Sequence, residues 1–192
     1  LVLLHGDGQY APEIIVDLIE DHIIQKNTLT LGSRMIIKTN ALKGKMPLYK
    51  FFGNIILTFI QNKFLGTNLS EFHTGYRVYS IKNLKKINFH LNTNDYHFDT
   101  EIIIQCILHN FKIGEHAIPT YYGDEISYVN GLKYAFNILK ETIKFKLQRF
   151  SIFYDKKYEL QTSEMYYDKS NFYSTHSVAC EFIKNNSYVI DL

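Results

Sequence analysis

The chain has 192 residues, of which 46% are hydrophobic and 21% charged, and its formal net charge is +2. This composition supports a packed core and excludes a wholly disordered chain, and the small net charge gives the chain as a whole no strong attraction to nucleic acid. Its two cysteines, Cys106 and Cys180, have no spacing that pairs them, so we expect reduced thiols in a cytoplasmic protein. No stretch of the sequence reaches the roughly 20 apolar residues of a membrane-spanning helix.

The amino-terminal segment predicts a buried strand that ends in a polar turn, with the sequence LVLLHGDGQYAPE. Residues 1–4 are apolar without alternation, which is typical of the end of a central strand. Ligands of open α/β sheets bind just beyond the carboxyl ends of strands, and His5, Asp7 and Gln9 stand at that place. A carboxylate there suits either a ligand site or a simple turn, and the segment by itself leaves both interpretations open.

Strands and helices alternate through the following segments, which predicts an α/β class with a mixed sheet. Proline in the first helical turn is expected to open two of the helices, at Pro12 and Pro47. Asp99 and Glu101 stand in the first turn of another, where the helix dipole favours carboxylates. The expected elements are helices at 12–25, 47–64 and 100–110, strands at 28–31, 78–80 and 112–118, and a mobile loop at 35–46.

Residues 130–150 predict a basic amphipathic helix. Its polar side carries four lysines and one arginine against one glutamate, and its apolar stripe consists of Phe136, Leu139, Ile143, Leu147 and Phe150. A helix of this kind can lie on an anionic membrane surface, which would make the protein peripheral at the inner face of the membrane. The same pattern also suits a helix that packs on the sheet and keeps its lysines in water.

Four sequence blocks occur in a fixed order. They are Asp7-Gly-Gln9, then Thr30-Leu-Gly-Ser-Arg34, then Leu69-Ser-Glu-Phe-His-Thr-Gly-Tyr-Arg77, and finally Phe98-Asp-Thr-Glu101 with Gly114-Glu115 and Ile118-Pro119 downstream. Each block alone is a weak signal, but the four in order are specific. Over residues 1–150 they resemble a family 2 glycosyltransferase, of the branch similar to dolichyl- and polyprenyl-phosphate sugar synthases.

This resemblance implies a GT-A fold, which is a Rossmann-like α/β sandwich that binds a UDP- or GDP-sugar. Members of the family place one or two βα units before the metal motif, so we expect residues 1–150 to be the C-terminal part of a GT-A domain. The chain would then be an N-terminally truncated fragment, inactive by itself. Residues 151–192 read as a linker, and Ser174-Thr-His-Ser-Val with Val189-Ile-Asp-Leu192 resembles the entry to a class I S-adenosylmethionine methyltransferase. A plain linker and partial tail would explain the same residues.

The resemblance also assigns roles to individual residues. In the family an Asp-x-Asp signature binds the metal and the donor diphosphate, and here its two positions are His5 and Asp7. Mg²⁺ or Mn²⁺ would be held by Asp7 and Gln9, with His5 either a third ligand or a turn residue. Arg34 and Arg77 match family arginines that would bind the donor diphosphate together with Asp7 and Gln9.

Two further residues concern the acceptor. Lys50 falls near a basic residue that related enzymes use for an acceptor phosphate, although a solvated lysine explains it equally. Glu71 stands where many members carry Asp, and with Asp7 it forms the expected catalytic pair. Glu71 would be a general base if the acceptor is a hydroxyl, or a positioning group if the acceptor is already an anion.

The predicted activity is the metal-assisted, inverting transfer of a sugar from a nucleotide-sugar to a polyprenyl phosphate or a glycan, in polysaccharide biosynthesis. One alternative is a nucleotidyltransferase on a similar sheet. The other is a non-catalytic module of a polysaccharide-biosynthesis fusion protein, and its main support is His5 in place of the first carboxylate.

Overall fold

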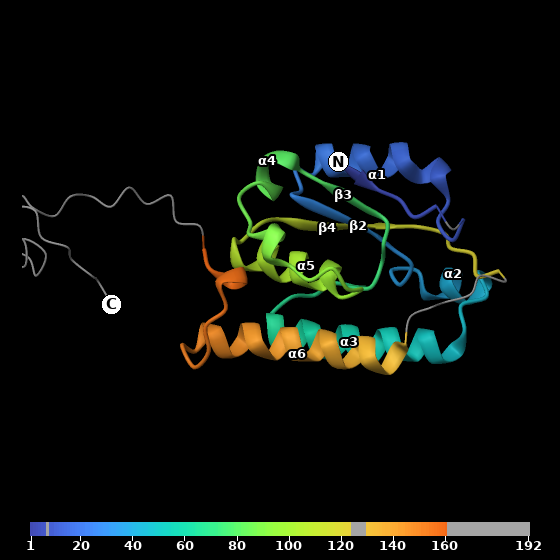
Figure 1. Ribbon diagram of the computed structural model, residues 1–192. Helices are drawn as coiled ribbons and strands as arrows, with labels where there is room; N and C mark the ends of the chain where they lie inside the picture. The colour runs from blue at the N-terminus through green and yellow to red at the C-terminus, as the bar shows by residue number, and fades with distance from the viewer. Residues whose placement is uncertain (7, 124–129, 161–192) are drawn as a thin grey trace, which may run out of the picture. The chain divides into compact units, whose positions relative to one another are not determined.

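The computed structural model describes residues 1–6, 8–123 and 130–160. They form a mixed four-stranded sheet in the order β1-β3-β2-β4, with helices on both of its faces (Figure 1). β2 (Leu29–Ser33) and β4 (Ile113–Ala117) are parallel, and β3 (Arg77–Tyr79) runs antiparallel to β2 and to β1 (Val2–Leu3). This architecture confirms the predicted mixed α/β class and is consistent with a Rossmann-like GT-A fold.

Helices cover the two faces of the sheet unequally. On one face lie α1 (Ile15–Ile24), which continues from the 3-10 turn η1 (Pro12–Ile14), and the short α4 (Ile81–Leu84). The opposite face is covered by α5 (Phe98–Leu108). The predicted helices that begin at Pro12 and near residue 100 are therefore confirmed.

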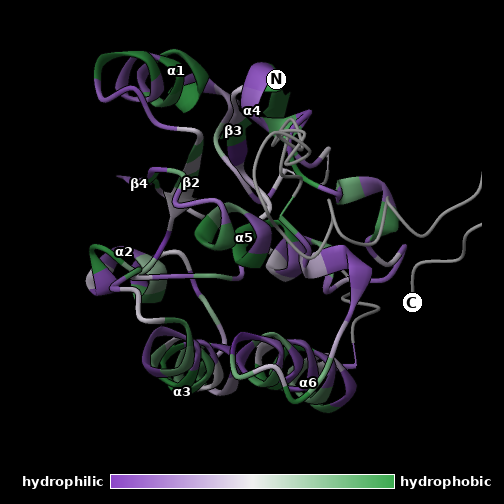
Figure 2. Cartoon of the chain, turned by 90° about the vertical axis from the view of Figure 1, so that its left-hand side faces the viewer, coloured by the Kyte–Doolittle hydropathy of each residue, from purple (hydrophilic) through white to green (hydrophobic). Residues whose placement is uncertain are grey.

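Two long helices form a further layer beyond α5. α3 (Leu48–Leu65) and α6 (Gly131–Arg149) pack side by side there (Figures 1 and 2). Both were predicted, and local chemistry explains their ends. The Asn130 side chain caps α6 by accepting a hydrogen bond from the Lys133 backbone nitrogen at 3.1 Å, and Gly66 ends α3 with a left-handed φ of 72°. The remaining elements are α2 (Lys38–Lys43), η2 (Phe89–Leu91) and η3 (Lys156–Tyr158).

Apolar residues are buried on both faces of the sheet. The cluster on the α1 face includes Leu18 and Val78, and the cluster on the α5 face includes Leu31 and Ile103. Cys106 belongs to the second cluster, and burial raises the pKa of its thiol to about 12. Because β2 and β4 are parallel, their carboxyl ends lie at one edge of the sheet, where ligands of α/β proteins bind.

Two local predictions were wrong. The first segment is not a central strand, because β1 lies at the edge of the described sheet and Leu1 is 61% exposed. The segment 35–46 is not a mobile loop, because it contains α2 and buries Met35, Ala41 and Met46 against Phe51. In both cases tertiary packing, which the local pattern does not report, decided the outcome.

The apolar stripe predicted for α6 does not pack on the sheet. Ile138, Glu141, Thr142 and Phe145 are the buried residues of this helix, whereas Phe136, Ile143 and Phe150 are exposed. The interior-facing stripe is therefore partly polar, and the packing alternative for the predicted apolar stripe is wrong.

The predicted linker begins at residue 151, but its first part packs with the preceding helices. Tyr158 is buried and its ring lies against Phe145 of α6, and the first compact unit extends from Leu1 to Gln161. The residues that resemble a methyltransferase, and Cys180, lie outside the described residues.

None of the helices in the described part of the chain combines the length and the apolar character that crossing a bilayer requires.

Candidate functional site

Four of the predicted site residues meet around the side chain of Tyr122, just beyond the carboxyl end of β4. Arg34 donates a hydrogen bond from Nη1 to the Tyr122 hydroxyl at 2.6 Å. Burial raises the pKa of Tyr122 to about 12, and the Gln9 side chain is among the groups that oppose this shift. The Lys50 ammonium lies 5.4 Å from the centre of the Tyr122 ring. Glu71 joins this group through its ion pair with Arg34. The structure thus brings together residues that are far apart in the sequence.

The Arg34–Glu71 pair is buried and its hydrogen bonds are extensive. Glu71 accepts hydrogen bonds from the Arg34 backbone nitrogen at 2.8 Å, from its Nε at 2.9 Å and from Nη2. The Asn54 side chain, on α3, donates to the same carboxylate at 2.7 Å. Nη2 of Arg34 also donates to the His73 carbonyl oxygen at 2.9 Å. Together with the Tyr122 hydroxyl, Glu71 and the His73 carbonyl give the guanidinium three hydrogen-bond partners that fix its orientation.

Electrostatics keep both groups charged. Burial by itself would raise the pKa of Glu71, but the Arg34 charge and the hydrogen bonds from Arg34 and Asn54 outweigh burial and hold that pKa below its ordinary value. Burial opposes the charge of Arg34, and Glu71 overcomes it, so the pKa of Arg34 is raised well above its usual range. A carboxylate with a lowered pKa is a weak proton acceptor near neutral pH.

A second carboxylate lies beneath Glu71. Glu115, on β4, accepts hydrogen bonds from the Ser70 hydroxyl at 2.6 Å and from the Ser70 backbone nitrogen at 2.9 Å. The Ser70 hydroxyl is also 2.6 Å from the Ser33 hydroxyl at the end of β2. These contacts tie the loop that carries Glu71 to the two parallel strands.

The amino-terminal turn meets the site from the other side. The His5 ring lies 5.8 Å from the Tyr10 ring, and Arg34 stands 5.9 Å above Tyr10. A Cβ atom at Gly75 would overlap the His5 ring, so glycine permits this approach. Asp7 itself lies outside the described residues, and its predicted role stays a prediction.

Arg77 is separate from this group and lies in the interior. Its guanidinium donates to the carbonyl oxygens of Phe72 and Thr74, at 3.0 and 2.7 Å, and to that of Asp99 at 2.9 Å. The Asp99 carboxylate adds an ion pair at 3.5 Å. In this structure Arg77 therefore holds the loop after Glu71, and the role predicted for it toward a phosphate stays a prediction.

His73 is a polar residue in the same loop, and no chemical role was predicted for it. Its Nδ1 lies 3.3 Å from the Tyr134 hydroxyl of α6, and its Nε2 has no hydrogen-bond partner within the described part of the chain. Burial lowers the pKa of His73 to about 4, so its ring is neutral at pH 7. Tyr134 also lines a hollow of about 120 Å³, with Asp95, Tyr96, His97, Asn130, Lys133 and Asn137.

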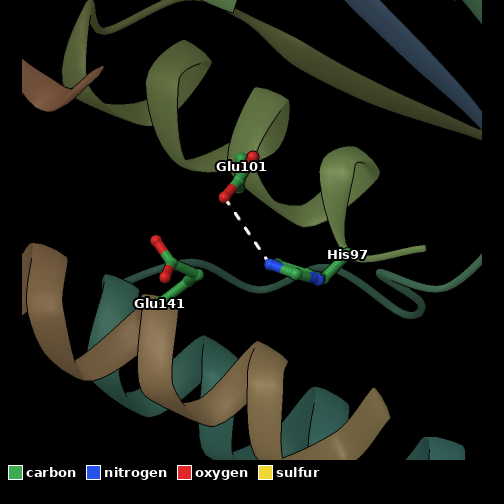
Figure 3. Close-up of side chains that lie close together, drawn as sticks. All are labelled: His97, Glu101 and Glu141. Atoms are coloured by element: carbon green, nitrogen blue, oxygen red, sulfur yellow. Dashed lines mark ion pairs between the residues drawn. The ribbon is translucent and has the colours of Figure 1, made fainter. Parts of the chain in front are cut away.

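A group that could hold a metal ion lies elsewhere than predicted. Figure 3 shows His97, Glu101 and Glu141, which come from the start of α5, from α5 and from α6. Their ligand atoms all lie within 4.8 Å of one another, and His97 Nε2 is 3.8 Å from Glu101. The Lys157 ammonium already contacts both carboxylates, at 2.5 and 3.0 Å. An ion would therefore have to replace the charge of Lys157.

Two residues that contact the Arg34–Glu71 pair, Tyr122 and Asn54, were not predicted from the sequence. Tyr122 follows a strand parallel to β2, so its position beyond the carboxyl end of β4 was an available signal. Asn54 gave no such signal, because an asparagine in a helix has many ordinary uses and its partner Glu71 is fixed only by packing.

Comparisons with known proteins identify relatives of the chain. An uncharacterized protein of Methanocaldococcus jannaschii is 29% identical over 148 residues, which is 74% of this chain and 60% of that protein. The UDP-N-acetylglucosamine–dolichyl-phosphate N-acetylglucosaminyltransferase of Methanococcus voltae is 32% identical over 121 residues, or 63% of this chain. The chain spans 47% of that enzyme. No family model matches the chain, and no solved structure matches it significantly. The chain is thus similar to part of a glycosyltransferase.

Proposed function

We propose that this chain is part of a glycosyltransferase that moves a sugar from a UDP- or GDP-sugar to a polyprenyl phosphate or a glycan. The observation that carries the proposal is the similarity to an enzyme whose name states a dolichyl-phosphate acceptor and a UDP-sugar donor. The grouping of Gln9, Arg34 and Lys50 around Tyr122, with Glu71 bound to Arg34, supports it. The resemblance assigns Gln9 and Arg34 to the donor, Lys50 to the acceptor and Glu71 to catalysis.

The donor diphosphate would bind at the edge of the sheet where β2 and β4 end. Arg34 is held there by Glu71 and Tyr122, and a fixed, planar guanidinium suits phosphate oxygens. Gln9 lies against the same tyrosine. Binding would require the Arg34 donors to be shared between Glu71 and the phosphate, or the side chain to move.

For Glu71 the lowered pKa supports the positioning role over that of general base. A carboxylate engaged by Arg34 and Asn54 has few lone pairs left for an acceptor hydroxyl. An acceptor that is already an anion needs no strong base, so the polyprenyl phosphate is the acceptor that this arrangement suits. Lys50, beside Tyr122, would face its phosphate.

A divalent cation fits the chemistry of the amino-terminal turn. Asp7, Gln9 and His5 offer a carboxylate, an amide oxygen and an imidazole within five residues, a set that suits Mg²⁺ or, with imidazole, Mn²⁺. When bound, such an ion would neutralise charge on the leaving diphosphate. Inverting transfer in polysaccharide biosynthesis remains part of the proposal. We place the end of the glycosyltransferase part at the end of the first compact unit, near Gln161, and not at residue 150 as the sequence predicts.

The test is sugar transfer by the native gene product, overproduced in membranes and supplied with radiolabelled UDP- or GDP-sugars and Mg²⁺ or Mn²⁺. We expect label in the organic-extractable lipid, and Asp7→Asn or Arg34→Met should abolish it. Asp17→Asn, on the exposed side of α1, is the matched control and should keep activity. Label in the glycan fraction alone would exclude the lipid acceptor, and no transfer from any donor would contradict the proposal.

A further inference from the structure

The long helix α3 has polar residues on its buried side and apolar residues on its exposed side. Its buried stripe contains three polar residues among five: Phe51, Asn54, Thr58, Gln61 and Leu65. Its outward stripe is apolar, since Leu48, Tyr49, Phe52, Ile56 and Phe59 are each more than half exposed. A helix that covers the core of a globular domain shows the opposite pattern, with the apolar stripe inside.

The neighbouring helix α6 has the same reversed pattern. Glu141 and Thr142 are buried on its inner side, whereas Leu132 and Phe136 are 86% and 67% exposed. Because α3 and α6 pack side by side in one layer beyond α5 (Figures 1 and 2), their outward stripes share one side of the molecule. We call this surface the outer face; it consists of the outward residues of α3 named above with Lys63, and of Leu132, Lys133, Phe136, Lys140 and Ile143.

Buried polar contacts fix this orientation of the two helices. Asn54, on the inner side of α3, donates to Glu71 at 2.7 Å. On the inner side of α6, Glu141 binds Lys157 at 3.0 Å and accepts a hydrogen bond from the Tyr158 hydroxyl at 3.0 Å. Turning either helix to bury its apolar stripe would break these bonds and leave charged groups without partners, which is costly. The exposure of the apolar stripes is therefore built into the fold.

The charges on the outer face have one sign. Residues 48–65 include no acidic residue, and the single acidic residue of α6, Glu141, is buried and paired. Lys63, Lys133 and Lys140 are exposed. Docking of two copies through this face would bring like charges together across a self-complementary interface. An anionic surface, in contrast, complements both the apolar residues and the lysines.

We propose that the outer face of α3 and α6 docks on an anionic lipid bilayer. The apolar side chains would enter the boundary between headgroups and acyl chains, and the lysines would contact the anionic headgroups. A contiguous apolar patch of this kind on a surface marks an interaction site, and the absence of acidic side chains on α3 and on the outer side of α6 selects a lipid surface as its partner. This inference does not rest on the proposed sugar transfer, because it concerns a different surface and a different measurement.

The experiment is flotation of the 192-residue chain with vesicles of phosphatidylcholine, with and without phosphatidylglycerol. We expect binding to the anionic vesicles, and weaker binding in high salt because lysine contacts are screened. The double substitution Ile56→Ser/Phe59→Ser should lower the partition coefficient by about tenfold or more, from the burial of each apolar side chain. Lys63→Gln and Lys140→Gln should each lower it by about five-fold.

Matched controls are available on the opposite side of the sheet. Ile23 and Ile24, on α1, are as exposed as the α3 residues, and Ile23→Ser/Ile24→Ser should leave vesicle binding unchanged. Lys82→Gln/Lys85→Gln serves the same purpose for charge. Far-UV circular dichroism verifies folding of every variant, and the lysine variants test the proposal even where a serine variant unfolds.

Three results would overturn the proposal. The first is equal vesicle binding by the α3, lysine and α1 variants, and the second is no binding to anionic vesicles at all. The third is a dimer, detected by sedimentation, that the α3 substitutions dissociate while vesicles remain unbound, because the outer face would then be covered by a second copy.

Discussion

At the scale of single residues, the ion pair between Arg34 and Glu71 is the most constrained contact of the candidate site. Glu71→Gln keeps the shape of the side chain and leaves the buried guanidinium without a counter-charge. We expect the free energy of unfolding to fall by about 3–5 kcal/mol, the usual cost of breaking a buried pair, measured by urea denaturation. Glu20→Gln, on the exposed side of α1, is the control. A loss below about 1 kcal/mol would mean that Arg34 finds another partner.

His73 makes the stability depend on pH. Burial lowers the pKa of His73 to about 4, whereas the unfolded value is about 6.5. Between these values His73 binds a proton in the unfolded chain but not in the folded chain. The contribution of His73 to stability therefore rises as pH rises from about 4 to about 6.5 and is constant above. His22 and His109, whose pKa values burial also lowers, act in the same direction.

The variant His73→Gln isolates this contribution. We expect the difference in the free energy of unfolding between pH 7 and pH 4.5 to shrink by about 2 kcal/mol relative to the unsubstituted chain. Chemical denaturation at both pH values measures it. An identical pH dependence in the variant would show that a proton binds His73 in the folded state as readily as in the unfolded state.

The sequence identified most residues of the site but not how they contact one another. Gln9, Arg34 and Glu71 stand in recognisable blocks, and the ends of strands predicted their location. Tyr122, which connects them, and Asn54, which orients Glu71, depend on side-chain geometry that arises only when α3 and the segment after β4 pack together. Local sequence does not specify such partners.

At the scale of elements, Gly44 joins the C-terminus of α2 to the segment that carries Tyr122. Its carbonyl oxygen accepts a hydrogen bond from the Tyr122 backbone nitrogen at 2.8 Å, and a Cβ atom at this position would overlap the Thr120 carbonyl oxygen. Gly44→Ala should therefore displace this backbone and lower the free energy of unfolding by about 1–3 kcal/mol.

Gly53 gives the matched comparison. It lies inside α3, where an added Cβ atom meets nothing within 4 Å, so Gly53→Ala should raise stability by about 0.5–1 kcal/mol through helix propensity. Thermal melts of the two variants measure the contrast. Equal effects at the two positions would show that the backbone near Thr120 can move away from the added Cβ atom without a loss in the free energy of unfolding.

Secondary structure was predictable where residues act locally and unpredictable where packing decides. Prolines 12 and 47 opened helices as expected, and Asn130 capped α6. Within the described sheet β1 pairs only with β3, which places it at the edge. The residues that flank α2, Met35 and Met46, are buried with Phe51. The apolar periodicity of residues 130–150 correctly predicted a helix, but periodicity does not say which side of the helix faces the interior.

At the scale of the whole molecule, Lys157 connects three segments. Its ammonium lies between Glu101 of α5 and Glu141 of α6, and it comes from η3, beyond both helices in the sequence. The side-chain hydrogen bonds to Glu101 and Glu141 overcome the effect of burial and raise the pKa of Lys157. Together with the packing of Tyr158 on Phe145, this cluster holds residues 156–158 in the same compact unit as the sheet.

Removing this ammonium should both weaken the unit and create a cation site. In Lys157→Met two buried carboxylates face each other beside His97, and we expect the free energy of unfolding to fall by about 3–5 kcal/mol. Because Mn²⁺ or Zn²⁺ would then find two carboxylates and an imidazole without a competing charge, either ion should raise the melting temperature of the variant more than that of the unsubstituted chain. Lys156→Met, at the exposed neighbouring position, should change neither property. An equal response of all three proteins to the metal would mean that Lys157 does not occupy the position of the cation.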